Sequence, residues 1–141
     1  MKFKKYYGAK TKSRSGFEQK IKTDLDQRGI KYGYETIKLK YTKICCGECG
    51  AVVQHGTYTP DFIIDRQSGV PLIVEGKGYF DSPDRTKMLS VKRDNPTADI
   101  RFLFVRDNPI RKGSKTKYSD WCNKHGFLYD FGVEVPKGWL K

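Results

Sequence analysis

Two acidic residues and a lysine interrupt a stretch of sequence that otherwise resembles two apolar strands. Asp61 follows Pro60 in the first run, and Glu75 and Lys77 stand two residues apart in the second. Side chains two apart on a strand point to the same face of a sheet. The turn between the runs, residues 65–69, is short enough for an antiparallel hairpin, which would bring Asp61 close to Glu75.

Carboxylates that lie close together repel each other, and a divalent cation relieves that repulsion. Because hard oxygen ligands favour Mg²⁺, we predict Asp61 and Glu75 as Mg²⁺ ligands, with Mn²⁺ able to substitute and the carbonyl of Gly76 available to complete the shell. Lys77 would either deprotonate an attacking water or stabilise charge on phosphorus. The alternative is a structural ion pair among the three side chains, which at an exposed position stabilises a fold by only about 0–1 kcal/mol.

The charge balance predicts a polyanionic partner. The chain has 28 basic and 16 acidic residues, a net charge of +12 in 141 residues, and 13% of its residues are aromatic, a combination that favours nucleic acid. Basic side chains gather in residues 1–14, which hold no acid, and in residues 106–117. We expect phosphate contacts from Lys10, Lys12, Arg14, Arg111, Lys112 and Lys115. For the first eight residues alone, a solubilising tail is the alternative.

The sequence shows no secretory signal and no membrane span. Its N-terminus lacks an apolar segment, and no stretch approaches the ~18 apolar residues that a span requires. We therefore expect no membrane partner and an intracellular, reducing location. The four cysteines, Cys45, Cys46, Cys49 and Cys122, are then expected to be thiols or metal ligands rather than disulfides.

Helix and strand signals define the elements that must position these residues. Helices are expected at residues 15–28, 82–93 and 118–125, with N-caps and glycine stops at Ser15, Ser82, Ser119, Gly29 and Gly126. Strands are expected at residues 30–39, 58–64, 72–75, 100–105 and 127–131, with a hairpin-like insert at residues 42–56. The order predicts an α/β (α+β) fold with a mixed sheet flanked by helices. We expect a basic arm at residues 1–14 and a single domain at residues 15–141, with a cysteine-containing insert at residues 43–56.

Ordered sequence blocks over most of the chain carry a family resemblance. They include Tyr7–Lys10, Arg14–Glu18, Gly29–Tyr32, His55, Thr57–Phe62, Val74–Gly78, Asp84–Arg85, Asp99–Arg101, Cys122, Lys124–Gly126, Pro136 and Trp139. The chain resembles the phage endonuclease I family, the Holliday-junction resolvases of T-odd phages, within the PD-(D/E)xK nucleases.

The resemblance implies a restriction-endonuclease-like fold, a catalytic set and a substrate. The catalytic residues would be Glu18, Asp61, Glu75 and Lys77, acting in a homodimer whose N-terminal helix and first strand are exchanged, so that each active site is composite. Without the resemblance, the sequence favours Glu18 as a capping-box partner of Ser15. The implied activity is metal-dependent hydrolysis of phosphodiester bonds at four-way junctions and other branched DNA by paired nicks. A phage-encoded protein would act in the cytoplasm of its bacterial host.

The cysteine-containing insert departs from the family pattern. Cys46-Gly47-Glu48-Cys49-Gly50 is typical of a zinc-knuckle turn, so Cys46 and Cys49 are possible ligands of a structural Zn²⁺. The remaining ligands would be His55 and Cys45, or a second knuckle across a two-fold axis. Unliganded cysteines are the alternative, and Cys122 and His125 are interpreted as core or helix-end residues.

Two other functions remain compatible with the sequence. One is a non-catalytic, zinc-containing nucleic-acid-binding protein in which the acids form structural pairs. The other is a nuclease for mismatches or other DNA structures. Metal-dependent cleavage would distinguish a nuclease from the first alternative. Substrate preference would distinguish a nuclease for branched DNA from the second.

Overall fold

A mixed five-stranded sheet forms the centre of the protein. The computed structural model describes residues 16–44 and 48–141. The sheet has the strand order β1-β4-β5-β6-β7, from β1 (Gly33–Tyr34), β4 (Phe62–Ile64), β5 (Leu72–Lys77), β6 (Asp99–Phe104) and β7 (Leu128–Phe131). The first three pair antiparallel and the last three parallel, which confirms the predicted mixed sheet and its hairpin.

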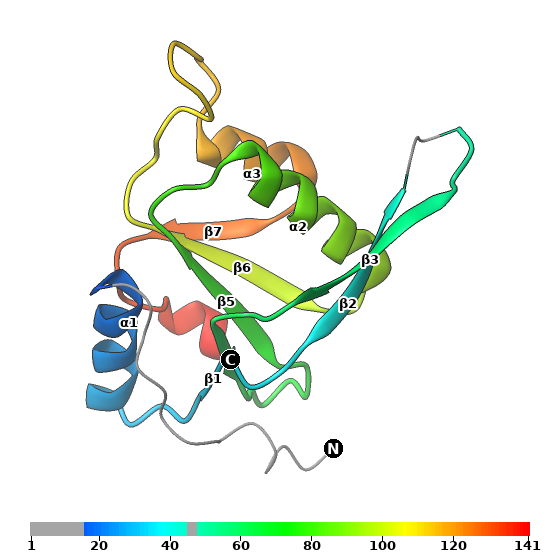
Figure 1. The fold of residues 1–141 in the computed structure, drawn as a ribbon. Coiled ribbons are helices and arrows are strands. Elements are labelled where there is room, and N and C mark those ends of the chain that lie inside the picture. Colours follow the sequence, from blue (N-terminus) through cyan, green and yellow to red (C-terminus); the bar gives the residue numbers. More distant parts are fainter. Residues whose placement is uncertain (1–15, 45–47) are drawn as a thin grey trace.

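Helices cover both faces of this sheet (Figure 1). α2 (Ser82–Asp94) connects β5 to β6, and α3 (Tyr118–His125) precedes β7. α1 (Gly16–Gln27) packs on the opposite face, together with the C-terminal 3-10 turn η1 (Lys137–Leu140). In the described part of the chain, the helices are too short or too polar to cross a bilayer.

Two predicted helix caps are wrong. Asp81 rather than Ser82 caps α2, because the Asp81 carboxylate accepts a hydrogen bond from the Asp84 amide at 2.9 Å. At α3, the Asp120 carboxylate accepts from the Lys117 amide, whereas the predicted cap, Ser119, binds Asp107. The predicted cap Ser15 lies outside the described residues.

Both predicted glycine stops are confirmed. Gly29 and Gly126 have φ values of +66° and +72°, the left-handed conformation in which helices commonly end.

Two of the predicted strands are interrupted, both at the end of the β1–β4 pair. Residues 30–39 do not form one strand, because Glu35 adopts a φ of +50° after β1 and the chain leaves the sheet. Residues 58–64 are divided at Pro60, which has no N–H to donate to a ladder. The chain therefore enters and leaves the sheet at adjacent points, where the Glu35 amide donates to the Asp61 carbonyl.

The predicted insert is a long two-stranded hairpin. β2 (Leu39–Ile44) pairs antiparallel with β3 (Val52–Tyr58), from Leu39↔Tyr58 to Ile44↔Val52. The hairpin projects beyond the sheet (Figure 1), and its base is held on α2, where Asp94 accepts from the amide and hydroxyl of Thr42.

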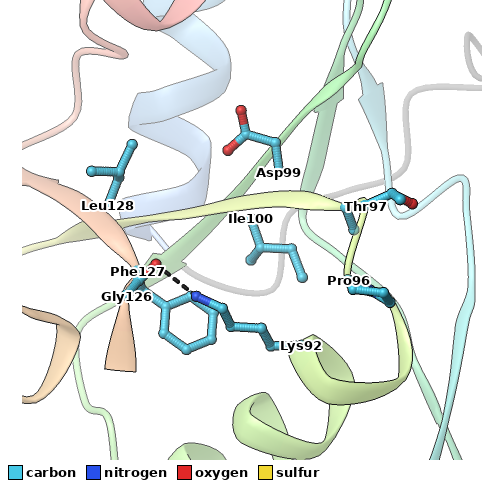
Figure 2. A pocket seen from close by; sticks show the side chains of 9 residues that line it. Lys92, Pro96, Thr97, Asp99, Ile100, Gly126, Phe127 and Leu128 are labelled. Atoms are coloured by element: carbon cyan, nitrogen blue, oxygen red, sulfur yellow. Dashed lines mark hydrogen bonds between the residues drawn. The ribbon is translucent and has the colours of Figure 1, made fainter. Parts of the chain in front are cut away.

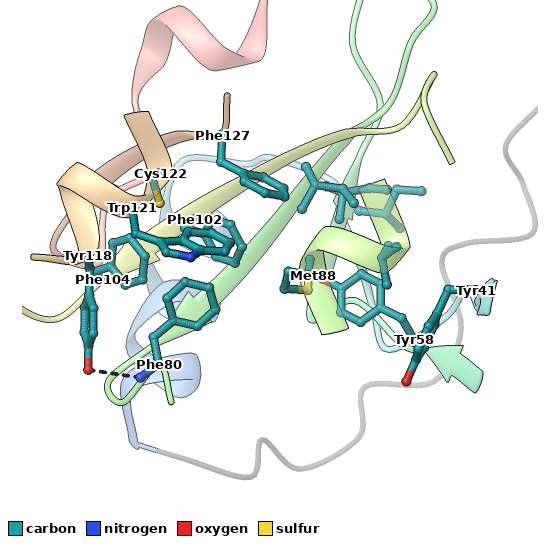
Figure 3. Close-up of a cluster of buried hydrophobic side chains, with 14 residues drawn as sticks. Tyr41, Tyr58, Phe80, Met88, Phe102, Phe104, Tyr118, Trp121, Cys122 and Phe127 are labelled. Carbon is teal, nitrogen blue, oxygen red and sulfur yellow. Dashed lines mark hydrogen bonds between the residues drawn. The ribbon is translucent and has the colours of Figure 1, made fainter. Parts of the chain in front are cut away.

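The core divides into two clusters on the two faces of the sheet. The α2–α3 face holds an aromatic cluster in which Phe80 packs against Phe102, Phe104, Tyr118 and Trp121 (Figure 3). The α1 face is mainly aliphatic and includes Ile21, Leu25, Phe62, Leu72, Val74 and Leu103. Ile21 and Leu25, which stand four residues apart on α1, are fully buried in this cluster.

Candidate active site

Asp61 is held at the open edge of β5 by its position just ahead of β4. The last pair between these strands is Phe62↔Val74, so β5 has no β4 partner beyond Val74. Asp61 Oδ2 fills this gap by accepting from the Gly76 amide at 2.9 Å, and the Asp61 amide donates to Glu75 Oε2 at 3.2 Å. The two acids predicted from spacing are therefore adjacent.

Glu75 is oriented by a tyrosine at the base of the hairpin. The fully buried Tyr58 hydroxyl donates to Glu75 Oε2 at 2.6 Å, and Glu75 itself is only 6% exposed. Burial and then the Glu75 charge raise the pKa of Tyr58 well above its ordinary value, so the hydroxyl keeps its proton and remains a donor. Tyr58 was not among the predicted site residues, although its place two residues before Pro60 was a usable signal.

Lys77 lies between two carboxylates. Its Nζ is 3.5 Å from Glu75 Oε1 and 3.2 Å from Asp84 Oδ2, on the first turn of α2. Burial alone would lower the pKa of Lys77, but Glu75 and Asp84 outweigh it and raise the pKa. Lys77 is therefore a protonated cation at neutral pH.

Glu18 reaches the same place from α1 on the other face. A Cβ added to Gly76 would lie 3.0 Å from Ile21 Cδ1 and 3.3 Å from Phe17, so glycine at this position lets α1 approach β5 closely. The Glu18 carboxylate accepts a hydrogen bond from the Tyr34 hydroxyl. The structure thus brings Glu18 to the acid pair within one chain, whereas the resemblance implies a partner's Glu18.

A cleft of about 340 Å³ joins these groups. Its lining comprises Glu18, Glu35, Thr57, Tyr58, Thr59, Asp61, Glu75, Gly76, Lys77 and Lys87. All predicted catalytic residues line it. Sequence reasoning missed Glu35, which gave no signal, and Lys87, which lies three residues after Asp84 on α2 and so on the same helix face.

The two central carboxyls have too little positive charge around them to remain ionised easily. Burial, followed by the charges of Glu75 and Glu18, raises the pKa of Asp61 from 3.8 to about 8. Burial also raises the pKa of Glu75, although Lys77 and the Tyr58 hydroxyl oppose the shift. Additional positive charge at this position would therefore favour the ionised form of both acids.

This donor set fits a hard divalent cation. Asp61 and Glu75 are oxygen donors with raised pKa values, and Mg²⁺ commonly uses one or two carboxylates together with waters and substrate phosphate. Within residues 16–44 and 48–141, no group of three or more His, Cys, Asp or Glu side chains is placed to hold a metal ion. Such a site would depend on waters or substrate for its remaining ligands.

The predicted DNA contacts divide between described and undescribed segments. Arg111, Lys112 and Lys115 are exposed on the loop before α3, so they are available for phosphate. Lys10, Lys12 and Arg14 lie outside the described residues.

The cysteine predictions have mixed outcomes. Cys45 and Cys46 lie outside the described residues, and Cys49 is disulfide-bonded, contrary to the expectation of thiols. Because zinc binds thiolates, Cys49 could serve as a ligand only after reduction. Cys122 is a buried free thiol whose pKa burial raises to about 12, in agreement with a core position. The His125 ring packs at a tilt of 47° against Trp121 at the end of α3.

A second cavity, of about 300 Å³, lies between the end of α2 and the β6–β7 edge (Figure 2). Lys92 Nζ donates there to the carbonyls of His125 and Gly126, which lie at the end of α3. The lysine is thereby used in closing a helix terminus, so this cavity offers no set of groups for chemistry.

Comparison with known proteins identifies the family of the chain. The profile of the family described as phage endonuclease I matches residues 1–141. The chain is 36% identical over 131 residues to the endodeoxyribonuclease 1 of Enterobacteria phage T3, covering 88% of this chain and 78% of that protein. It is 35% identical over 129 residues to the endonuclease I of Escherichia phage T7, covering 91% of this chain and 78% of that protein. With its acid-lined cleft at the end of β5, the chain therefore belongs to the phage endonuclease I family.

Proposed function

We propose that the protein is a metal-dependent endodeoxyribonuclease that resolves four-way (Holliday) junctions and other branched DNA by paired nicks. The observation that carries this proposal is the convergence of Asp61, Glu75, Lys77 and Glu18 in one cleft. A family profile that matches the whole chain, and relatives named as endonucleases, support the same reading.

Each residue of the cleft has a role in hydrolysis of a phosphodiester bond. Asp61 and Glu75 would hold Mg²⁺, which when bound lowers the pKa of water and neutralises charge on phosphate. Because its pKa is raised, Lys77 is assigned the stabilisation of charge on phosphorus rather than the role of base. The other carboxylates that line the cleft, those of Glu18 and Glu35, are the available acceptors for the proton of the attacking water.

Paired nicks require paired sites, and a two-fold homodimer supplies them at a fixed separation. We propose such a dimer, with branched DNA selected by shape through phosphate contacts. The exposed cations Arg111, Lys112 and Lys115 would make part of those contacts. Binding should therefore weaken steeply as salt concentration rises.

Cleavage of a labelled four-way junction tests this proposal. Wild-type protein should cut two strands in Mg²⁺ or Mn²⁺ and none in EDTA. Glu75→Ala should abolish cutting while retaining junction binding, because it removes a negative charge near phosphate. Asp130→Asn is the matched control, since Asp130 is exposed on β7 at the far edge of the sheet. Absence of cleavage by the wild type, or full cleavage by Glu75→Ala, would exclude the proposal.

The same assay separates the alternatives. A non-catalytic nucleic-acid-binding protein would bind the junction without cutting it in any divalent ion. A nuclease for mismatches would cut a mismatched duplex in preference to the junction. Structural zinc is a separate proposal, checked by metal analysis of reduced protein, in which less than about a tenth of a zinc per chain would rule out a full site.

A further inference from the structure

The cleft contains more acids than cations, although its proposed substrate is an anion. Its ionisable lining consists of Glu18, Glu35, Asp61, Glu75, Lys77 and Lys87, apart from the neutral Tyr58. A phosphodiester that enters this cleft meets carboxylates on several sides, and like charges at short range repel. A cation that is not already paired would lower this repulsion.

Lys77 is not available for that purpose before the substrate binds. Its Nζ already lies 3.2 Å from Asp84 and 3.5 Å from Glu75, and it is 19% exposed. Moving it toward a phosphate would break contacts that hold Glu75 in place. The first contact with the substrate therefore falls to another group.

Lys87 has the right position for this contact. It lies about one turn after Asp84 on the same face of α2, and its side chain lines the cleft. Its Nζ is 5.4 Å from the centroid of the Tyr58 ring, which places the ammonium beside the residue that orients Glu75. Lys87 is half-buried, and it forms no ion pair with any residue that the structure describes.

We infer that Lys87 binds a non-bridging oxygen of the scissile phosphodiester and guides it to the acid pair. The inference rests on the proposed function and adds a substrate-binding residue to it. Ammonium groups bind phosphate as compact point charges, and the ring of Tyr58 limits the positions that the Lys87 side chain can occupy. Arg111, Lys112 and Lys115 would then contact flanking phosphates, whereas Lys87 contacts the reacting one.

A purely structural role for Lys87 makes a different prediction. Its charge lowers the pKa of Glu75, and its ammonium packs on Tyr58, so loss of the charge could disturb the site without any contact to DNA. Such a disturbance would not depend on the charge of one particular phosphate. The charge of that phosphate is therefore the variable to change.

A cycle of protein and DNA changes separates these roles. The cleavage position is first mapped with wild-type protein, and a junction is then made with a neutral methylphosphonate at that linkage. Binding of both junctions by wild type and by Lys87→Met is measured in EDTA, which prevents cleavage. We expect Lys87→Met to weaken binding of the normal junction about tenfold and to leave binding of the methylphosphonate junction almost unchanged.

Two further variants complete the test. Lys87→Arg should restore most of the lost affinity, because it keeps the charge. Lys124→Met, which removes an exposed cation from the end of α3, should weaken both junctions equally. If Lys87→Met weakened binding of both junctions equally while the wild-type protein still cleaved the normal junction, this inference alone would be overturned. Absence of any wild-type cleavage would overturn the proposed function and this inference with it.

Discussion

The sheet carries two groups of buried or half-buried acids, which differ in how fully Arg and Lys side chains neutralise them. At the start of β6, the Asp99 carboxylate accepts from Arg66 at 2.7 Å and from Arg101 at 2.9 Å. In the cleft, Asp61 and Glu75 are 8% and 6% exposed, and the one lysine paired with Glu75, among the described residues, is also paired with Asp84. The Asp99 group is neutralised by the protein itself, whereas the cleft is not.

The pKa values express this difference. Burial would raise the pKa of Asp99, but the hydrogen bonds from Arg101 and Arg66 outweigh it and lower the pKa. The pKa values of Asp61 and Glu75 are raised. A protein keeps acids in a poorly neutralised cluster at a cost in stability, and such clusters are frequent at functional sites. The comparison therefore indicates a structural role for Asp99 and supports the proposed chemistry of the cleft.

The largest expected effect is the loss of activity in Asp61→Asn. Replacing a residue that hydrogen-bonds to a metal ligand commonly lowers metal affinity or activity about 10–100-fold. Loss of a proposed ligand itself should therefore reduce cleavage at least about 100-fold. Asp99→Asn should cleave at close to the wild-type rate. Junction cleavage under single-turnover conditions measures both, and equal losses for the two variants would remove the distinction between the clusters.

A second prediction asks whether the cleft is complete in one chain. In the described residues, Glu18 lines the cleft together with Asp61 and Glu75 of the same chain, which favours a site assembled within one chain. Mixed dimers of Glu18→Ala and Glu75→Ala chains, isolated through two tags, should then be as inactive as either variant alone. Recovery of about half of the wild-type nicking would instead show exchange of α1, because one site would be intact.

Tyr58→Phe should have an intermediate effect. It leaves the ring and the core but removes the hydrogen bond to Glu75 Oε2, so we expect cleavage to fall about 10–100-fold. The Mg²⁺ concentration needed for half-maximal cleavage should rise as well. A purely structural role would instead lower thermal stability and leave that concentration unchanged.

Asp99→Asn should mainly affect stability. Loss of charged hydrogen bonds to Arg66 and Arg101 should lower the free energy of unfolding by about 1–3 kcal/mol. Urea unfolding at pH 7 measures this change. Asp61→Asn is the matched comparison and should be at least as stable as wild type in EDTA, because it removes a poorly neutralised buried carboxyl.

The last prediction concerns the pH dependence of stability in EDTA. Since the pKa of Asp61 is raised from 3.8 to about 8, the folded state holds a proton that the unfolded state has lost. The contribution of Asp61 should therefore favour folding below about pH 4 and decline as pH rises to about 8. Asp99 has the opposite sign, because its lowered pKa stabilises the fold above about pH 4.

Unfolding measurements from pH 4 to pH 8 check this prediction. Asp61→Asn should flatten the decline, and Asp99→Asn should leave it unchanged. An equally steep decline in Asp61→Asn would assign the effect to other groups.

Local patterns in the sequence carried much of the fold. Apolar runs, Gly29 and Gly126 predicted the helices, the mixed sheet and the hairpin insert, because periodicity and left-handed glycines act over a few residues. Strand limits were less predictable. Glu35 breaks the first expected strand, with a backbone conformation that residue type alone did not indicate.

By itself, the sequence determined which acids and which lysine could do chemistry. Residue types and two-residue spacing are enough to place Glu75 and Lys77 on one face of a strand, and the short turn brings Asp61 on the neighbouring strand close to Glu75. Only the tertiary structure decided how charged that set is and which groups join it. Burial raises the pKa of Asp61. Glu18 on α1 and Lys87 on α2 join the cleft from outside the β4–β5 hairpin, because packing depends on tertiary contacts that the pattern of the hairpin does not encode.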